Sequence, residues 1–242
     1  MNIICIIPSR LHSTRLPRKS LLPIQGKPMI QRVYESASRC SFLSQVIVAT
    51  DSKEIASVIE DMGGQVEMTD SELRTGSDRV AVVAERYPNA DIVINLQGDE
   101  PFIKPVMLEQ LVAPYLSGES PEMTTLAYPF DCEQDYHNPG CVKVILNQQG
   151  YALYFSRSPI PYFRSSVDAP VYHHMGLYAF RRDFLSIYQK LPQTPLEQAE
   201  QLEQLRVLEH GYQIRVCLTE HKSFEINTPE EYSAAQVFAF VE

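Results

Sequence analysis

Three cations that could grip phosphate groups lie close together near the N-terminus. Arg10, Arg15 and Lys19 directly follow an apolar run that stops at Pro8. Arginine forks bind phosphate oxygens in pairs and lysine adds a mobile point charge, so several cations in one loop suit a triphosphate. Neither G-x-x-x-x-G-K-[ST] nor G-x-G-x-x-G occurs here, so these side chains would take the role of the backbone amides in those loops. A solvated basic surface is the alternative.

A carboxylate with the chemistry of a metal ligand follows a later apolar run. Asp99 comes after Gly98 in the segment QGDEP, directly behind DIVIN. A carboxylate at this place could hold Mg²⁺ against phosphate oxygens. A Gly-Asp pair alone indicates no more than a turn. The pattern R-x(4)-R-x(3)-K after the first apolar run favours the magnesium hypothesis.

Apolar runs alternate with helical patterns in the first half of the chain, which is typical of a doubly wound, mostly parallel sheet. We expect strands at 2–8, 45–50, 65–68 and 91–95, helices at 28–39, 52–62, 78–87 and 105–115, and a turn at 74–77. Asp51 should cap the second helix, and Gly63-Gly64 should end it. Parallel strands end on one edge, so the basic loop and Asp99 should share a rim of the sheet.

The second half of the chain predicts successive strands with short links, instead of strands that alternate with helices. We expect strands at 123–128, 142–146, 151–155 and 175–180, which would form a mixed or antiparallel extension of the sheet. Capping boxes begin at Thr194 and at Thr228, each with proline at the first helical position. The first should open a helix that runs to about residue 210 and ends at Gly211.

Composition limits the class of protein. The chain has 242 residues and a net charge of −9, which argues against nonspecific nucleic-acid binding. Seven of its 21 Lys and Arg lie in the first 39 residues, beside one acid, Glu35. This asymmetry indicates a local anionic ligand or a solvated basic face. No linker separates the halves 1–120 and 121–242, so we expect one fused domain over 1–242.

The cysteines and the hydropathy indicate the compartment. The five cysteines are odd in number and form no C-x-x-C pair, so reduced thiols are expected rather than zinc or disulfides. No apolar stretch is long enough to cross a membrane. The first ten residues lack a basic leader and a cleavage site. We therefore expect a cytoplasmic protein without membrane insertion.

Blocks along the whole chain identify a family resemblance. They include IIPSRLHSTRLPRKSL, GKPMIQRVYE, VIVATD, INLQGDEP, ALYFSRSPIP, HMGLYAFR and LEQLRVLEHG, in this order. Together they closely resemble the 3-deoxy-manno-octulosonate (Kdo) cytidylyltransferases, and more distantly the CMP-sialic acid synthetases. The resemblance implies a nucleotide-diphospho-sugar transferase type of fold. It also implies transfer of CMP from CTP to the anomeric hydroxyl of Kdo with Mg²⁺, for lipopolysaccharide biosynthesis, and a homodimer. The aromatic, apolar segment 160–178 is the candidate interface.

The resemblance also implies roles for particular residues. Those assigned to the nucleotide are Pro8, Ser9, Arg10, Arg15, Lys19, Thr75, Gly76 and Gln97, with Arg15 and Lys19 on the β- and γ-phosphates. Those assigned to the sugar are Gln97, Arg157, His174, Tyr178, Glu203 and Gln204, with Arg157 on its carboxylate. Asp99 and Asn227 would hold the metal. Arg10, Arg15, Lys19 and Asp99 form the expected catalytic set.

Helical spacing gives partial independent support for the sugar set. Leu202, Leu205 and Leu208 should bury one side of the helix around residues 195–210 and leave Glu203 and Gln204 free for a site. Taken alone, each of these polar residues would more often be plain surface. His174 alone would more often be a hydrogen-bonded structural histidine.

Three positions depart from the family pattern. Arg18 stands where the family keeps glycine, and would strain the loop if the backbone there has positive φ. Ser20 replaces a proline and should free the chain. Asn227 replaces an aspartate, so we expect a lower affinity for Mg²⁺ unless Glu225, two residues earlier, compensates.

Two alternatives stay open at this point. One is the same chemistry on a modified ulosonic acid, such as an amino-Kdo. The other is a non-catalytic nucleotide-sugar binder, which the departures at Arg18 and Asn227 would suit.

Overall fold

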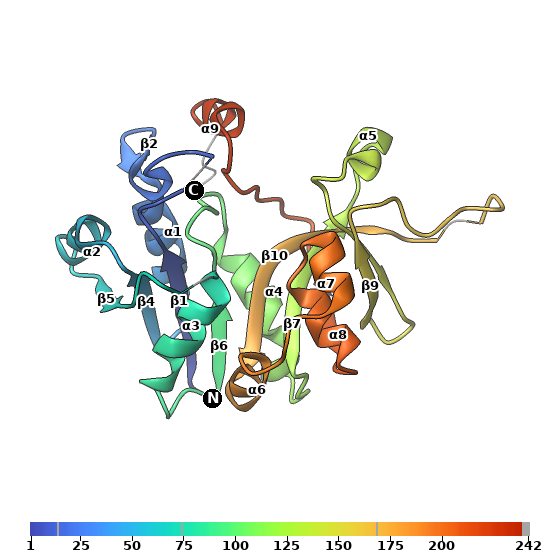
Figure 1. Cartoon of the computed structure of the whole chain (residues 1–242), viewed down its shortest axis with the longest axis horizontal. Coiled ribbons are helices and arrows are strands. Elements are labelled where there is room, and N and C mark those ends of the chain that lie inside the picture. The colour runs from blue at the N-terminus through green and yellow to red at the C-terminus, as the bar shows by residue number, and fades with distance from the viewer. Residues whose placement is uncertain (14, 74, 168, 239–242) are drawn as a thin grey trace. The chain divides into compact units, whose positions relative to one another are not determined.

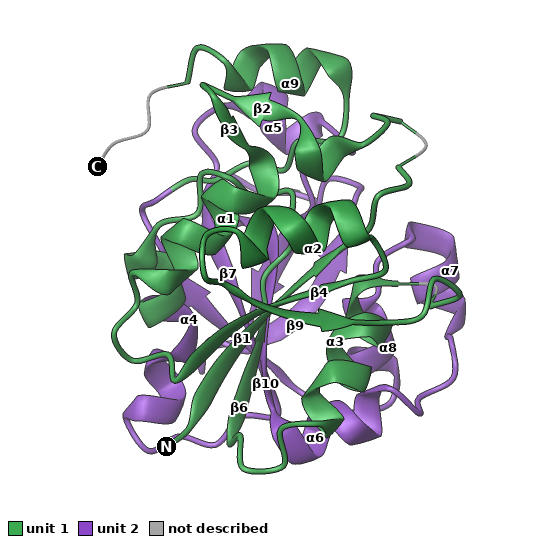
Figure 2. Cartoon of the chain, turned by 90° about the vertical axis from the view of Figure 1, so that its left-hand side faces the viewer, with its two compact units in different colours: residues 1–109, 222–242 green, residues 110–221 purple. Residues whose placement is uncertain are grey.

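The structure is a computed structural model of the chain that describes residues 1–13, 15–73, 75–167 and 169–238. Two compact units make it up, coloured separately in Figure 2. Unit 1 comprises residues 1–109 and 222–242, and unit 2 comprises residues 110–221. The C-terminal segment therefore belongs with the first half of the chain. The fusion of the halves into one domain stays a prediction.

Unit 1 is built on a parallel sheet. Its strands are β1 (Ile3–Ser9), β4 (Gln45–Thr50), β5 (Gln65–Met68) and β6 (Ile92–Asn95), in the spatial order β6-β1-β4-β5. Every residue of β1 and β6 is buried, as expected for strands covered on both faces. Helices α1 (Met29–Ser38) and α2 (Lys53–Glu60) pack on one face and α3 (Gly76–Glu85) on the other (Figure 2). The expected doubly wound arrangement is confirmed.

Two helix starts in unit 1 differ from the sequence prediction. The cap of α2 is Ser52, not Asp51, because the Ser52 hydroxyl accepts the hydrogen bond from the Ile55 amide. Helix α3 begins two residues early, because Thr75 and Asp78 form a reciprocal capping box. The expected turn at 74–77 begins at Arg74, which lies outside the described residues.

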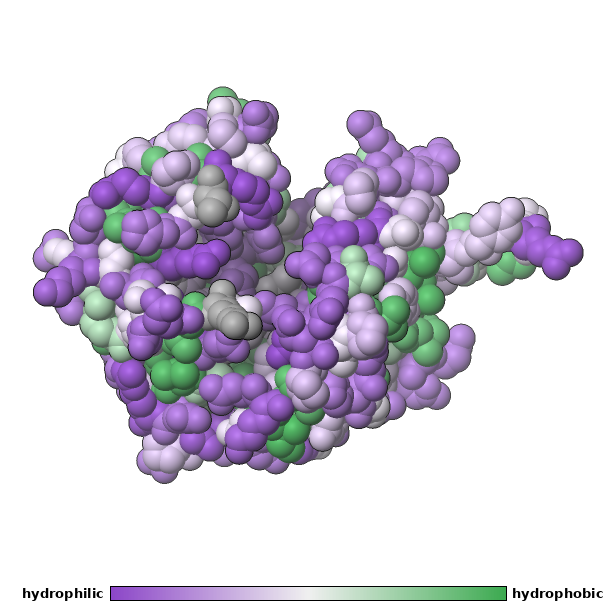
Figure 3. All heavy atoms as spheres, viewed as in Figure 1, coloured by the Kyte–Doolittle hydropathy of each residue, from purple (hydrophilic) through white to green (hydrophobic). Residues whose placement is uncertain are grey.

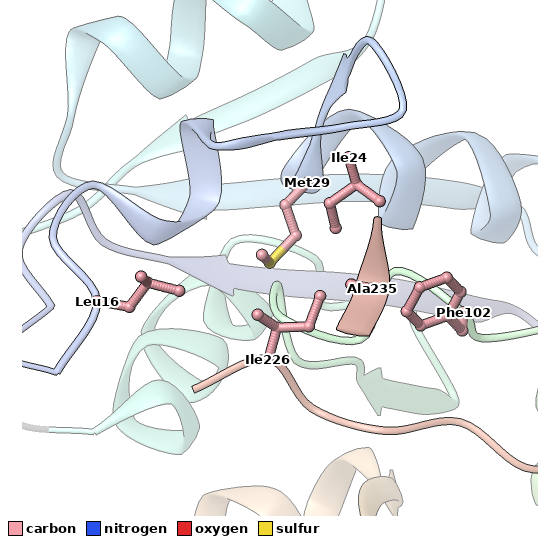
Figure 4. Packing of buried hydrophobic residues seen from close by; sticks show 6 residues of the cluster. All are labelled: Leu16, Ile24, Met29, Phe102, Ile226 and Ala235. Carbon is pink, nitrogen blue, oxygen red and sulfur yellow. The ribbon is translucent and has the colours of Figure 1, made fainter. Parts of the chain in front are cut away.

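The basic loop after β1 packs against other parts of unit 1. It contains a 3₁₀ turn, η1 (Lys19–Leu21), and a small antiparallel ribbon of β2 (Pro23–Ile24) and β3 (Lys27–Pro28). Apolar side chains from this loop meet the C-terminal segment, which contains α9 (Pro229–Ala235), in one cluster (Figure 4). Its buried members are Leu16, Ile24, Met29, Phe102, Ile226 and Ala235. Burying a side chain such as Ile226 is worth about 1.5–3 kcal/mol, enough to fasten the returning segment beside the loop.

Unit 2 contains a mixed sheet, as expected. Its strands are β7 (Met123–Pro129), β8 (Lys143–Leu146), β9 (Ala152–Ser156), β10 (Tyr172–Arg181) and β11 (Ile214–Leu218). Strand β10 pairs antiparallel with β7 and β8, β8 pairs antiparallel with β9, and β11 runs parallel to β7. The helices are α5 (Glu133–His137), α6 (Arg182–Tyr188), α7 (Pro195–Glu200) and α8 (Gln204–Glu209). Helix α4 (Pro105–Leu116) contains the boundary between the units.

The expected helix over residues 195–210 is wrong in one respect, because it is two helices. Gln201 adopts a left-handed conformation with φ of 53°, which ends α7 before α8 begins. The predicted capping box at Thr194 and the end at Gly211, with φ of 82°, are present. Arg206 of α8 forms a hydrogen-bonded ion pair with Glu197 of α7, so the two short helices are joined by a buried charge pair.

An arm between β9 and β10 projects from the rest of unit 2 (Figures 1 and 3). Tyr162 is 90% exposed, Val167 is 67% exposed and Phe163 is 45% exposed. Helices long and apolar enough to cross a bilayer do not occur in the described part of the chain.

Candidate active site

The site in unit 1 begins where two neighbouring strands end. Strands β1 and β6 pair in parallel, with Ile6 opposite Asn95, and the Leu96 amide donates to the Ile6 carbonyl at 3.1 Å. The chain after β1 and the chain after β6 therefore leave the sheet on the same edge. The predicted common rim for the basic loop and Asp99 is confirmed.

A cation and two oxygen acceptors meet at this rim. Lys19 Nζ donates to Asp99 Oδ2 in a close ion pair and to Asn227 Oδ1 at 2.9 Å. The Lys19 and Asp99 side chains keep 15% and 19% of their surface exposed. Three segments far apart in the sequence thus supply one cluster that solvent can still reach.

The three arginines of the loop have different surroundings. Arg15 joins the cluster, because its Nη2 donates to Asn227 Oδ1 at 3.1 Å. Arg10 is exposed, and none of the described residues pairs with its guanidinium. Arg18 is turned to another partner, since it donates to both carboxylate oxygens of Glu54 at 3.2 and 2.5 Å. Arg18 therefore adds no cation to the cluster.

The two departures within the loop have opposite effects on the backbone. Arg18 has φ of 55°, a left-handed conformation that favours glycine, so the expected strain is present. Ser20 does not free the chain as expected. Its hydroxyl is buried and accepts a hydrogen bond from the Ser9 hydroxyl at 2.7 Å, which ties the loop to the end of β1.

The residues expected to read the base also converge. A Cβ added to Gly76 would lie 3.2 Å from both Gln97 Oε1 and Pro8 Cγ, and one added to Gly98 would lie 2.9 Å from the Pro8 carbonyl. Gln97 is held by its own hydrogen bond to Asn95 Oδ1 at 3.0 Å. Thr75 serves as the N-cap of α3. Small residues here allow a flat group to approach the backbone closely.

Two further acids stand behind the cluster. Burial, with Glu225 and Asp99 nearby, raises the pKa of Glu100 to about 8, and the Ser223 hydroxyl donates to its carboxylate. Burial and the Asp99 charge also raise the pKa of Glu225. Asn227 Nδ2 donates to Glu225 Oε2 at 2.9 Å. Neither Glu100 nor Ser223 was predicted from the sequence, although Glu100 belongs to the QGDEP segment.

The donor set can be tested against a divalent cation. Mg²⁺ takes oxygen ligands and usually keeps only one or two carboxylates besides phosphate and water. Asp99 and Asn227 already direct oxygens at one positive group, the Lys19 ammonium, so a carboxylate and an amide oxygen suited to a cation lie side by side. Within the described residues, no three His, Cys, Asp or Glu side chains are placed to hold a metal by themselves. The set fits a metal that also binds a phosphate ligand.

In unit 2, the predicted sugar residue His174 is buried and hydrogen-bonded. Its Nε2 lies 3.0 Å from the Thr125 hydroxyl, which itself lies 2.8 Å from the Leu177 carbonyl. If the hydroxyl donates to that carbonyl, His174 carries its proton on Nε2 and Nδ1 accepts from Gln204 Nε2 at 3.5 Å. Burial lowers the pKa of His174 to about 3, so the ring is neutral near pH 7.

The neighbours of His174 include two more predicted sugar residues. Tyr178 donates its hydroxyl hydrogen to Gln204 Oε1 at 3.1 Å, and its ring lies against His174. Gln204 is not left free as expected, because it is only 3% exposed. Glu203 accepts from the Tyr188 hydroxyl at 3.3 Å. Gln204 begins α8 and is bonded to Tyr178 and His174.

Arg157, the predicted partner of the sugar carboxylate, is held by neutral oxygens. Its guanidinium donates to the carbonyls of Glu200 at 2.8 Å and Pro139 at 3.1 Å. The Glu200 carboxylate instead accepts from the Arg157 amide at 2.9 Å and the Ser156 hydroxyl at 2.7 Å. No carboxylate among the described residues forms an ion pair with the Arg157 side chain. Backbone oxygens thus hold the guanidinium in place.

Comparisons with known proteins agree with this geometry. Residues 4–215 match the family described as Cytidylyltransferase. The chain therefore belongs to the cytidylyltransferase family. It is 55% identical to a 3-deoxy-manno-octulosonate cytidylyltransferase of Acaryochloris marina, with 98% of this chain and 97% of that protein covered. It is 49% identical to the protein of the same name in Synechococcus elongatus strain PCC 7942, with 99% and 98% covered.

A solved structure is similar over nearly the full length. The structure of CMP:2-keto-3-deoxy-manno-octonic acid synthetase complexed with CTP superposes with a TM-score of 0.93 at 40% identity. The match covers 98% of this chain and 97% of that one.

Proposed function

We propose that this protein transfers CMP from CTP to the anomeric hydroxyl of Kdo, giving CMP-Kdo and pyrophosphate. The observation that carries the proposal is the meeting of Lys19, Asp99 and Asn227 at the joint end of β1 and β6. A cation beside metal-type oxygen ligands is what a triphosphate requires. Family membership and the names of its relatives support the same reaction.

Unit 1 would hold the nucleotide. Pro8, Gly76 and Gln97 border a backbone surface where the cytidine can lie flat, with Thr75 and Ser9 beside it. Arg10, Arg15 and Lys19 would neutralise the phosphates from the loop after β1. Such charge-assisted hydrogen bonds hold the triphosphate in one orientation, so that the bond to be broken points away from the attacking hydroxyl.

Asp99 and Asn227 would hold Mg²⁺. Held there, the ion would offset the negative charge that develops on the leaving group. In the reaction the anomeric oxygen forms a bond to the α-phosphorus, loses its proton, and the bond to the β-phosphate breaks. Lys19 and Arg15 supply positive charge to the departing pyrophosphate, where electrostatic stabilisation is most effective.

The side chains of unit 2 would bind the sugar. Arg157 can take its carboxylate, because backbone carbonyls hold the guanidinium in place and no carboxylate among the described residues forms an ion pair with it. His174, Tyr178 and Gln204 form a connected neutral group suited to sugar hydroxyls. Gln97 and Glu203 complete the proposed set.

Phosphorus NMR of a mixture of protein, CTP, Mg²⁺ and sugar tests the proposal. Kdo should give pyrophosphate and a CMP phosphodiester, and neither should form when Kdo is omitted. Product with an amino-substituted Kdo but none with Kdo would favour a modified ulosonic acid. Binding of CTP without product from any 3-deoxy-ulosonic acid would show a non-catalytic binder.

We also propose a homodimer that works in the cytoplasm. The exposed Tyr162, Phe163 and Val167 on the arm of unit 2 provide apolar area that a second copy could cover. The five cysteines are free thiols, as a reducing compartment allows. Sedimentation analysis should give twice the mass of the chain. Substituting Phe163 by Asp should shift it to the monomer mass.

A further inference from the structure

The proposed metal ligands contain one negative charge, and a neighbour supplies a second. Asp99 is a carboxylate and Asn227 is a neutral amide. Glu225 lies directly behind Asn227, whose Nδ2 donates to Glu225 Oε2 at 2.9 Å. A role for Glu225 at the metal site rests on the proposed function.

The Asn227 side chain has two ends with different partners. Its Oδ1 accepts from Lys19 Nζ at 2.9 Å and from Arg15 Nη2 at 3.1 Å. Its Nδ2 faces the Glu225 carboxylate. An amide can satisfy a cation on one side and an anion on the other because it is both acceptor and donor. Glu225 therefore fixes which end of Asn227 points toward the cations.

The backbone leaves this pair little freedom. Between the two residues, the buried Ile226 donates its amide to the Asp99 carbonyl at 3.0 Å. On the far side, the amides of Asn227 and Thr228 donate to Glu231 Oε2 at 2.6 and 2.9 Å, at the start of α9. The segment that carries Glu225 and Asn227 is thus fastened to the loop that carries Asp99.

We infer that Glu225 is a positioning residue for the divalent cation. Its carboxylate holds the Asn227 amide with Oδ1 toward the ion and supplies the second negative charge near it. Residues that orient a metal ligand through its other end contribute to metal affinity although they do not touch the metal. Position 227 thus supplies the ligand oxygen, and position 225 supplies the negative charge.

Titration with Mn²⁺ in the presence of CTP, read by the EPR signal of the free ion, tests this inference without measuring turnover. Glu225→Gln should weaken Mn²⁺ binding about 10–100-fold, the usual cost of losing a partner of a metal ligand. The double variant Glu225→Gln with Asn227→Asp places a carboxylate at position 227 instead, and should recover binding to within about threefold of wild type. Glu230→Gln, at an exposed position on α9, is the matched control and should bind as wild type.

The outcomes separate this inference from the proposed function. Wild-type protein that binds CTP but no Mn²⁺ would overturn the metal site itself. Wild-type affinity in Glu225→Gln, or failure of the double variant to recover, would overturn the role of Glu225 alone. Melting curves without metal identify a variant that does not fold. If Glu225→Gln unfolds, recovery in the folded double variant decides.

Discussion

The cluster of Lys19, Asp99 and Asn227 in unit 1 and the cluster around His174 in unit 2 use polar groups in opposite ways. In unit 1, charged side chains from distant segments meet at a surface where each keeps part of its exposure. In unit 2, His174 and Gln204 are almost fully buried, uncharged and bonded to each other.

This difference separates two tasks. Charges that solvent can reach are available to an incoming ion, whereas the neutral groups around His174 are held in fixed orientations by one another. Arg157 is the exception in unit 2, because its charge faces neutral carbonyls. Substitutions in the unit 1 cluster should therefore affect catalysis most. A substitution of Arg157 should affect mainly the affinity for the sugar, and a substitution of His174 should affect the pH dependence of stability.

The largest effect is expected at Lys19. Lys19→Met removes the cation beside Asp99 and Asn227, and should lower kcat/KM about 100–1000-fold, the usual cost of one preorganised electrostatic contact. Steady-state pyrophosphate release measures it. Lys27→Met is the matched control, because Lys27 is paired with Glu35 at 2.8 Å. An equal loss of kcat/KM in Lys19→Met and Lys27→Met would contradict a special role for the cluster within the loop.

Arg157→Lys should act mainly on the sugar. A lysine keeps the charge but loses the fork that the carbonyls of Glu200 and Pro139 hold. The KM for Kdo should rise about 10–100-fold, the range for hydrogen bonds to a charged group. The dissociation constant of CTP should not change. Arg181→Lys, which alters an arginine bonded to Asp183, should leave the KM for Kdo as it is. A change confined to CTP binding would refute this assignment.

His174 should make the protein sensitive to acid. Its pKa is about 3 when folded and about 6.5 when unfolded, so the unfolded state binds more protons between these values. This contribution is absent above pH 6.5 and lowers the free energy of unfolding as the pH falls, by about 1–2 kcal/mol at pH 5. His174→Gln should make the stability profile shallower between pH 7 and 5, measured by urea unfolding. Part of the slope should remain, because burial also lowers the pKa of His173, to about 4. His137→Gln, at an exposed position, should keep the wild-type slope, and equal slopes in all three proteins would contradict the account.

The smallest effect is expected at Arg18. Glycine tolerates the left-handed backbone at this position, and a surface ion pair such as that with Glu54 contributes little. Arg18→Gly should therefore raise the melting temperature by about 2–4 °C. A lower melting temperature would mean that the pair with Glu54 outweighs the backbone strain.

The sequence predicted what depends on local patterns. The limits of β4 and β5 follow from short apolar runs, and the helix starts at Pro195 and Pro229 follow from capping boxes. Neither glycine nor proline marks the break at Gln201, so the sequence predicted one continuous helix. Three elements of unit 2, α5, α6 and β11, were not predicted at all.

Long-range contacts were the harder part of the site. The shared rim could be predicted, because parallel topology alone places Asp99 beside the loop after β1. The family resemblance supplied Asn227. What it could not supply was the burial of Glu100 against Ser223, whose hydroxyl donates to the Glu100 carboxylate. This contact depends on the return of the C-terminal segment, where Ile226 and Ala235 pack with Leu16 and Ile24 some 200 residues away, and no local pattern encodes it.

The central claim is that the cluster at the end of β1 and β6 holds a triphosphate. Calorimetric titration with CTP and with CMP, on wild type and on a variant with both Arg15→Met and Lys19→Met, tests it directly. Wild type should bind CTP about 100-fold or more tightly than CMP, and the variant should lose this preference, because two charge-assisted contacts are removed. Equal binding of CTP and CMP by wild type, or an unchanged preference in the variant, would contradict the claim.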